Sequence, residues 1–384
     1  MKKRINFEDN IFLGCLFLLV LLSELSKIYF ISQSKFILSI LSYIEIPLYL
    51  ELFFCIFQKR YKSNQLLIFA FISLILLIGY LKSGMAGFFR GFLLLIASKN
   101  IDYIKIIKSI RISMILSLLI SLILYGLGIS NAGVQRRGYV AFGFEHPNVF
   151  AQVVMLILLL WYAEKGKTMK TKQYILFLAV GMIIYFLSGS RTALIVLAAL
   201  PICILFLKPI ILENKIYTFR KILIILSQAI MCTFTYLSAI LIEHSSIIIA
   251  LDGLLVNRIF LNYYALKNWD VKLFGQNTDL RTMGTVYNNI RNIYWSTGST
   301  VDSSYMTSIL VMGIIPTIIA GIGFLLVMKR AINEKNIIII SLSIVCSIYG
   351  FMETSMIEIY NSFFYFYLMS KSSDLLPKKR NSNL

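Results

Sequence analysis

Apolar runs follow one another along almost the whole chain, separated by short polar segments. A helix needs roughly 20 predominantly apolar residues to cross a hydrocarbon core of about 30 Å. The pattern predicts twelve membrane spans, of which the fourth, eleventh and twelfth are the shortest. They are expected at about residues 11–31, 36–57, 65–81, 84–98, 112–130, 147–164, 174–188, 191–208, 222–243, 303–328, 337–352 and 359–370.

Composition supports a polytopic membrane protein. Hydrophobic residues make up 58% of the 384 positions and charged residues only 14%, and the mean hydropathy is +0.80. These values are too apolar for a soluble chain of this length. No polar linker separates the runs, so we expect residues 1–384 to form a single all-α transmembrane bundle. The five cysteines lie in or beside apolar runs without paired spacing, which predicts small core residues.

Basic residues indicate the orientation, because they are retained on the cytoplasmic side during insertion. With a cytoplasmic N-terminus, 25 of the 37 Lys and Arg residues fall in inner segments. This predicts cytoplasmic termini and a long extracytoplasmic loop at 244–302. The net charge of +19 is then mostly inner lysine facing anionic lipid, which argues against nucleic-acid binding.

Arginine departs from this distribution. Inner segments contain 19 of the 24 lysines but only 6 of the 13 arginines. A guanidinium keeps its charge and can bind phosphate through two hydrogen bonds. The outer arginines are therefore candidate anion ligands, with contact to lipid headgroups as the alternative. They are Arg90, Arg136, Arg137, Arg191, Arg258, Arg281 and Arg291.

Two outer segments carry the first candidate residues. Arg191 lies in SGSRTAL, between the seventh and eighth spans. The segment 131–148 brings Arg136 and Arg137 close in sequence to His146 and Asn148. Pro147 suits the first turn of the sixth span. His146 is a candidate general base, and the alternative is that His146 and Asn148 cap this helix.

The long loop contains the third candidate segment. Residues 251–269 have helical periodicity and are expected to lie as one helix on the outer interface, while 270–302 are expected to form a loop. Asn257 and Arg258 lie in the helical part. The motif VDSSYMTSILVMG, 301–313, opens the tenth span and contains Asp302 and Tyr305. Asp302 is a candidate base, or alternatively the N-cap of that span.

In this order, GFEHPNVFA, SGSRTAL, Asn257-Arg258 and VDSSYMTSILVMG resemble the O-antigen polymerase and ligase superfamily, and more closely its Wzy-type repeat-unit polymerases of capsules and exopolysaccharides. The resemblance implies an inverting, metal-independent glycosyltransferase without a cofactor, located in the plasma membrane with its active site facing outward. Its partners would be a polyprenyl-pyrophosphate-linked glycan donor and acceptor, membrane lipids, a flippase and a chain-length regulator.

The resemblance also implies residue roles. Arg191 and Arg258 would hold the pyrophosphate, and Asp302 would act as the base, with His146 as the second candidate. Arg136, Arg137, Asn148 and Tyr305 are further substrate-binding candidates. Fixed cations at the leaving group and a positioned carboxylate at the attacking hydroxyl both lower the barrier to such a transfer.

Other interpretations remain open. A ligase would move a finished glycan to another acceptor with the same donor chemistry. A flippase or transporter would need charges at mid-depth and repeated, interrupted helices. A non-catalytic assembly partner would leave the arginines and Asp302 without a purpose. Glu45, beside Pro47 in the second span, is a candidate functional group whose partner could be Arg90.

Overall fold

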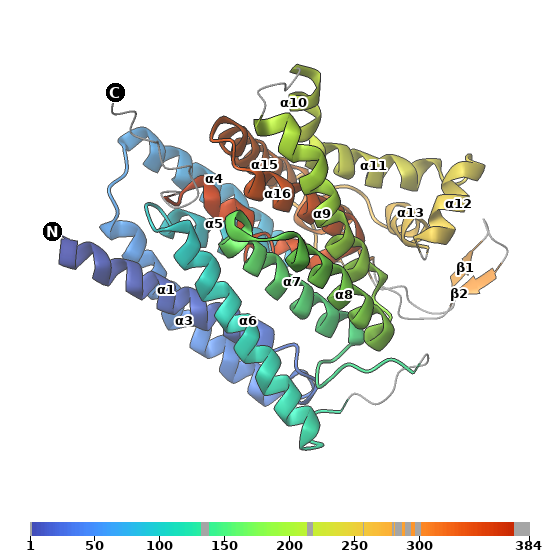
Figure 1. The fold of residues 1–384 in the computed structure, drawn as a ribbon, viewed down its shortest axis with the longest axis horizontal. Helices are drawn as coiled ribbons and strands as arrows, with labels where there is room; N and C mark the ends of the chain where they lie inside the picture. The colour runs from blue at the N-terminus through green and yellow to red at the C-terminus, as the bar shows by residue number, and fades with distance from the viewer. Residues whose placement is uncertain are drawn as a thin grey trace.

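The computed structural model of the protein is a helical bundle with one short β-hairpin (Figure 1). It describes residues 2–131, 138–212, 218–255, 257–278, 280, 286–288, 293–295 and 301–371.

The first half of the chain is helical. Its elements are α1 (Lys2–Leu25), α2 (Tyr29–Ser32), α3 (Lys35–Gln58), α4 (Ser63–Ser83), α5 (Gly87–Ala97), α6 (Tyr103–Gly126), α7 (Pro147–Lys165), η1 (Gly166–Thr168), α8 (Thr171–Ser188) and α9 (Arg191–Leu212).

The second half contains shorter and more irregular elements. They are α10 (Thr218–Ile225), α11 (Ser227–Leu241), α12 (Ser246–Leu254), α13 (Arg258–Asn268), β1 (Val286–Asn288), β2 (Ile293–Trp295), α14 (Ser304–Thr307), the π-helical turn η2 (Ser308–Met312), α15 (Ile314–Asn333), α16 (Ile337–Met352), η3 (Thr354–Ile357) and η4 (Phe363–Leu368). The antiparallel β1–β2 pair puts Tyr287 opposite Tyr294.

Several helices are long and apolar enough to cross a membrane. In the described part of the chain there are six, namely α3, α4, α6, α7 (with η1), α8 and α15. A seventh results if α11 and α12, which meet at a bend of 118°, count as one broken span. The surfaces of α3 and α4 are rich in exposed Phe, Leu and Ile side chains. This is the fold of a helical multi-pass membrane protein.

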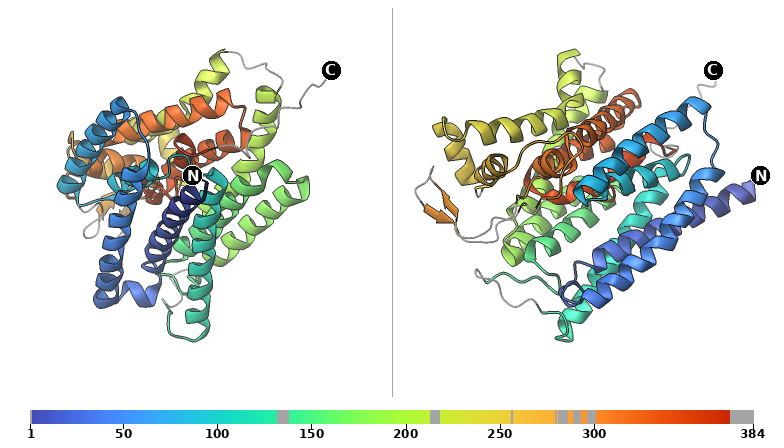
Figure 2. Two further views of the ribbon diagram at one scale, coloured as in Figure 1. Left: turned by 90° about the vertical axis from the view of Figure 1, so that its left-hand side faces the viewer. Right: turned by 180° about the vertical axis from the view of Figure 1, so that it is seen from behind.

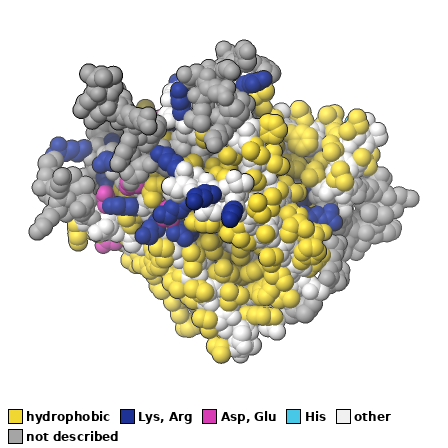
Figure 3. All heavy atoms as spheres, viewed as in Figure 1, with side chains coloured by type: hydrophobic (Ala, Val, Ile, Leu, Met, Phe, Trp, Pro, Cys, Tyr) yellow, Lys and Arg dark blue, Asp and Glu magenta, His cyan; other side chains and the backbone are white. Residues whose placement is uncertain are grey.

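Charged side chains gather at one end of the bundle. On the face in Figure 3, hydrophobic side chains cover the middle, and Lys and Arg cluster toward the end where α1 begins. Lys59 Nζ, after α3, lies 3.3 Å from Asp9 Oδ1 of α1. Lys99 Nζ donates to the Arg60 carbonyl at 2.7 Å, and the Lys371 carbonyl accepts from Tyr103 N at 3.0 Å. The beginning and the end of the described chain therefore both contact the inter-helix segments around residues 59–60 and 99–103.

The core lies where six helices pack against one another. The helix α6 contacts α1 and α7, and α9 contacts α8 and α16; the views in Figure 2 show these helices running together through the bundle. Buried Ile, Leu, Phe and Tyr side chains fill the interior. All five cysteines are free thiols in buried or half-buried positions, which confirms the prediction of small core residues.

The expected tenth span, 303–328, is not one helix. It breaks at Gly313, whose φ of 98° is open to glycine but strained for other residues. The first N–H groups of α15 therefore have no partner within a continuous helix. Ile314 N and Ile315 N donate instead to the carbonyls of Lys272 and Leu273, in the segment that follows α13. A Cβ on Gly313 would lie 2.2 Å from Gly275 N. Close backbone packing thus terminates the helix where hydropathy predicts continuity.

Other expected helices are also divided or shortened. The expected ninth span is α10 and α11 with a break at Leu226, and the expected twelfth is the 3-10 helix η4. The expected interfacial helix 251–269 is α12 and α13, separated at Asn257, which has a positive φ of 64°. Hydropathy identifies apolar segments of the chain. It does not distinguish a straight helix from one that bends or breaks.

Candidate functional site

The SGSRTAL segment forms a tight turn between two helices. Gly189 ends α8 in the left-handed conformation, with φ of 69°, and its N–H donates to the Tyr185 carbonyl. Ser190 follows as a helix cap, since its hydroxyl accepts from Ala193 N at 3.5 Å. This turn places Thr192, which is almost completely buried, in the first turn of α9.

A buried carboxylate fixes the start of α13. Asp252 Oδ1 accepts hydrogen bonds from Ile259 N at 2.8 Å and from Phe260 N at 3.1 Å. Asp252 has no exposed surface. It therefore satisfies two of the free N–H groups at the helix N-terminus and holds Arg258, the first residue of α13, in place.

Asp302 does not cap the following helix. The N-cap of α14 is Ser303, whose hydroxyl accepts from Met306 N at 3.4 Å. The Glu353 carbonyl, just beyond α16, accepts from Ser304 N at 3.0 Å and from the Ser304 hydroxyl. The capping alternative for Asp302 is thereby wrong, and the Asp302 side chain remains 35% exposed.

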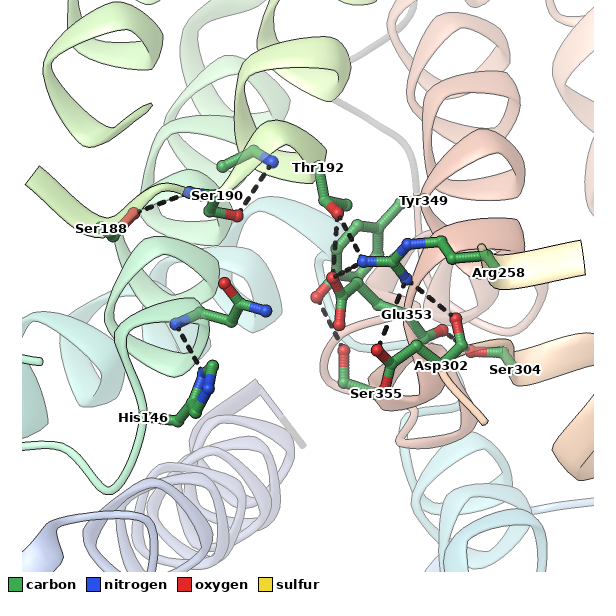
Figure 4. A network of polar contacts seen from close by, with 12 residues as sticks. His146, Ser188, Ser190, Thr192, Arg258, Asp302, Ser304, Tyr349, Glu353 and Ser355 are labelled. Atoms are coloured by element: carbon green, nitrogen blue, oxygen red, sulfur yellow. Dashed lines mark hydrogen bonds and ion pairs between the residues drawn. The ribbon is translucent and has the colours of Figure 1, made fainter. Parts of the chain in front are cut away.

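Arg258 is the centre of a four-residue polar cluster (Figure 4). Its Nη2 donates to Glu353 Oε1 at 3.2 Å and to Thr192 Oγ1 at 3.3 Å. Its Nη1 donates to the Asp302 carbonyl at 3.1 Å and lies 3.9 Å from Asp302 Oδ2. Thr192 Oγ1 in turn donates to Glu353 Oε1 at 2.9 Å. We call Thr192, Arg258, Asp302 and Glu353 the Arg258 cluster.

Burial controls the charge of Glu353. The side chain is 16% exposed and Arg258 only 13%. Burial raises the pKa of the Glu353 carboxyl, and nearby Asp302 adds to this shift, whereas Arg258 and the Thr192 hydroxyl oppose it. The pair is therefore a partly desolvated ion pair whose carboxylate is easier to protonate than an exposed one.

A narrow polar gap, which has no room for a water molecule, adjoins the Arg258 cluster. Its lining comes from α7 on one side and from α9 and the end of α16 on the other. The polar lining residues are Asn148, Gln152, Ser190, Thr192, Tyr349 and Glu353. We call this space the α7/α9 gap.

His146 caps α7 across from the Arg258 cluster (Figure 4). Its Nδ1 accepts from Asn148 N at 3.1 Å, so the capping alternative is confirmed for His146. Surrounding atoms lower the pKa of His146 by desolvation, and Asp302 opposes the shift. Because Nδ1 is an acceptor, neutral His146 carries its proton on Nε2. The nitrogen lone pair that a base would use is thus already engaged.

The remaining predicted residues are placed differently. Arg191 is exposed, and no described residue bonds to its side chain. Asn148 lines the α7/α9 gap. Tyr305 is buried, and its hydroxyl donates to the Ser347 carbonyl at 2.8 Å, which is a packing position outside that gap. Arg136 and Arg137 lie outside the described residues.

Glu45 and Arg90 form a second polar cluster within the bundle. Arg90 Nη1 lies 2.9 Å from Glu45 Oε2, and the guanidinium stacks over the Tyr49 ring at 5.3 Å. With Glu358, these residues line a cavity of about 50 Å³. The possible pairing of Glu45 with Arg90 is confirmed.

Three residues of the site were not predicted from the sequence. Thr192 follows Arg191 in the SGSRTAL motif, and Asp252 lies six residues before Arg258. Glu353 follows the expected span 337–352 at its outer end. A polar residue directly after an apolar span was the available signal for Glu353. In the part of the chain that the structure describes, no group of three or more His, Cys, Asp or Glu side chains is arranged to hold a metal ion.

Comparison with known proteins gives no relative. No family model matches the chain, and neither a curated protein nor a solved structure is similar to it.

Proposed function

We propose that this protein polymerises polyprenyl-pyrophosphate-linked oligosaccharide repeat units on the outer face of the plasma membrane. The observation that carries the proposal is the Arg258 cluster, in which residues from four distant segments converge. Glycosyl transfer from a pyrophosphate needs a cation at the leaving group and a base at the attacking hydroxyl. Arg258, at the start of α13, could supply the cation, and the partly exposed Asp302 carboxylate beside it could supply the base.

The proposed topology is twelve membrane passes with both termini in the cytoplasm. The segment 244–302 would form the extracytoplasmic loop and carry Arg258 to the outer surface. The lysine distribution supports this orientation. Broken elements such as α10–α11 and η4 would be passes shielded by neighbouring helices, as irregular backbone at membrane depth requires.

The proposed reaction is a single inverting displacement. A lone pair of the acceptor hydroxyl oxygen forms the bond to the anomeric carbon. The bond from that carbon to the pyrophosphate oxygen breaks, and its electron pair stays on the pyrophosphate. The hydroxyl proton passes to the Asp302 carboxylate. Arg258 and Arg191 would stabilise the charge on the departing pyrophosphate.

Asp302 is a better base than His146 for a geometric reason. The Nδ1 lone pair of His146 accepts the Asn148 N–H, so neutral His146 offers only its Nε2 proton. Asp302 has a half-exposed carboxylate that an incoming hydroxyl could reach. Arg258 lies close enough to keep that carboxylate oriented.

Reconstitution tests the proposal. The purified protein in liposomes, supplied with its lipid-linked repeat unit, should yield a ladder of products that differ by one repeat. Asp302→Asn should lose the ladder while retaining the melting temperature of the wild type. A full ladder from Asp302→Asn would remove Asp302 from the mechanism. Transfer of one finished glycan to a different acceptor would indicate a ligase, and movement of lipid-linked sugar without a new glycosidic bond would indicate a flippase.

A further inference from the structure

One hydrogen-bond donor of His146 is available to a bound molecule. Because Nδ1 accepts from Asn148 N at 3.1 Å, the neutral imidazole carries its proton on Nε2. His146 is exposed, and within the part of the chain that the structure describes no residue accepts a hydrogen bond from Nε2. The helix cap thus fixes the tautomer and the direction of the ring, and leaves the Nε2–H open.

The start of α7 holds His146 beside the Arg258 cluster. Asn148, two residues further on, faces Glu353 across the α7/α9 gap, which is too narrow for water. Figure 4 shows His146 across from Asp302. Desolvation lowers the pKa of His146, and the nearby Asp302 carboxylate opposes that shift, yet no hydrogen bond joins the two side chains. The two groups therefore lie near each other without occupying each other.

His146 and Asp302 offer complementary contacts to a sugar. The carboxylate only accepts hydrogen bonds, and Nε2–H of a neutral imidazole only donates. In the proposed function, Asp302 takes the proton of the attacking hydroxyl. The neighbouring oxygens of the same ring keep their lone pairs and can accept from Nε2–H. The negative charge of Asp302 disfavours an anion between the two residues, so a neutral sugar fits this place better than a phosphate.

We infer that His146 and Asp302 form the subsite for the acceptor sugar, in which His146 Nε2 donates to a ring oxygen next to the attacking hydroxyl. This inference rests on the proposed function, and it assigns the acceptor to the α7 side of the Arg258 cluster. His146 is then a substrate-binding residue, and its proton is not transferred in the reaction.

Two substitutions separate the hydrogen bond to the sugar from the helix cap. His146→Asn keeps an oxygen that can accept from Asn148 N, since asparagine is a favoured N-cap, but it has no donor at the position of Nε2. His146→Gln is longer, so it gives up the cap and can place an amide N–H where Nε2 lay. The melting temperature should therefore fall for His146→Gln and stay at the wild-type value for His146→Asn.

Activity should follow the opposite order. The assay uses a donor with a blocked non-reducing end, which cannot act as acceptor, and an acceptor repeat unit on an alkyl chain without pyrophosphate, which cannot act as donor. His146→Asn should raise the acceptor KM by about two- to tenfold, the range of one net hydrogen bond, with kcat and donor KM unchanged. His146→Gln should keep an acceptor KM close to the wild type.

The matched control is His244→Asn. This substitution makes the same change at the other histidine of the chain, an exposed residue that follows α11. Both KM values and kcat should stay at the wild-type values.

Several outcomes would overturn the inference. One is an unchanged acceptor KM in His146→Asn. Another is a KM that follows the melting temperature and rises more in His146→Gln, which would assign His146 a structural role alone. A rise confined to the donor KM would place the donor at His146, and a 100-fold fall in kcat would make His146 a general acid or base. If the wild type forms no glycosidic bond with any acceptor, the proposed function itself fails, and the acceptor subsite fails with it.

Discussion

Arg258 Nη2 lies 3.2 Å from Glu353 Oε1, and both groups bind the same hydroxyl, that of Thr192. The guanidinium proposed to hold the pyrophosphate is therefore already paired with a carboxylate in this structure. In the proposed function, a pyrophosphate oxygen would have to compete with Glu353 for Nη2. Glu353 thus orients the Arg258 guanidinium and also partly neutralises its charge.

This relationship predicts a pH effect on stability. Because burial raises the pKa of Glu353, the folded protein holds this proton more tightly than the unfolded chain does. The contribution of Glu353 to stability is fully present below the pKa of an exposed Glu, about 4.3, and is lost as the pH rises through the higher pKa of the folded state. Melting temperatures of the wild type and of Glu353→Gln across this window should converge at its acid end and diverge at its alkaline end. Parallel curves would contradict the assignment.

Arg258 should not be replaceable by lysine. An ammonium keeps the charge but cannot contact Glu353, Thr192 and Asp302 through a planar fork. We expect the turnover of Arg258→Lys to fall by about 100-fold, the effect of removing one preorganised charge-stabilising donor. Arg60→Lys, at the other end of the bundle, should keep wild-type turnover in the same liposome assay. Equal activity of the two variants would exclude a charge-stabilising role for Arg258.

Arg191 should behave differently from Arg258, because it is exposed and unbound by described residues. Arg191→Ala should leave the melting temperature unchanged and raise the donor KM. The rise should be on the order of tenfold at low salt and smaller at high salt, since the interaction of an exposed charge is screened. A salt-independent KM, or a large loss of stability, would show that Arg191 does not act as an exposed anion ligand.

Asp252 should act through α13. Asp252→Ala removes a side chain of α12 that caps the N-terminus of α13 with two hydrogen bonds, and it should destabilise the protein by about 1–2 kcal/mol. Because the cap also positions Arg258, turnover should fall as well. Asp252→Asn, which can still accept the Ile259 N–H, should recover most of both losses. If Asp252→Asn recovers stability but not turnover, the hydrogen bonds of residue 252 to α13 do not position Arg258 for catalysis.

The Glu45–Arg90 pair should be coupled. Either Glu45→Gln or Arg90→Met removes the ion pair and leaves one charge with fewer partners, and each single variant should be destabilised by about 1–3 kcal/mol. The double variant should be less destabilised than the sum of the two single variants. Denaturation in detergent measures all four proteins. Additive losses would mean that the 2.9 Å contact contributes no net stability.

Hydropathy predicted the straight helices well and the broken ones poorly. The expected spans 36–57 and 337–352 correspond to α3 and α16 almost residue for residue. The span across Gly313 was missed because its break depends on hydrogen bonds from Lys272 and Leu273, which no local pattern reports. Gly313 and Pro316 were the only nearby signals of a break.

The site was partly predictable for a related reason. Arg258 and Asp302 have side chains whose chemistry stands out in an apolar chain, and the structure brings them together across 44 positions. Thr192 and Glu353 are separated by 161 positions, and each alone resembles an ordinary residue at a helix end. Their roles follow only from the way α9 packs against α16.

The most direct test of glycosyl transfer counts both products in one reaction. With a chelator present, the reconstituted wild-type protein should release one polyprenyl pyrophosphate for each new glycosidic bond, and Asp302→Asn should produce neither. New bonds without released polyprenyl pyrophosphate, release without new bonds, or complete loss of wild-type activity on chelation would contradict the account.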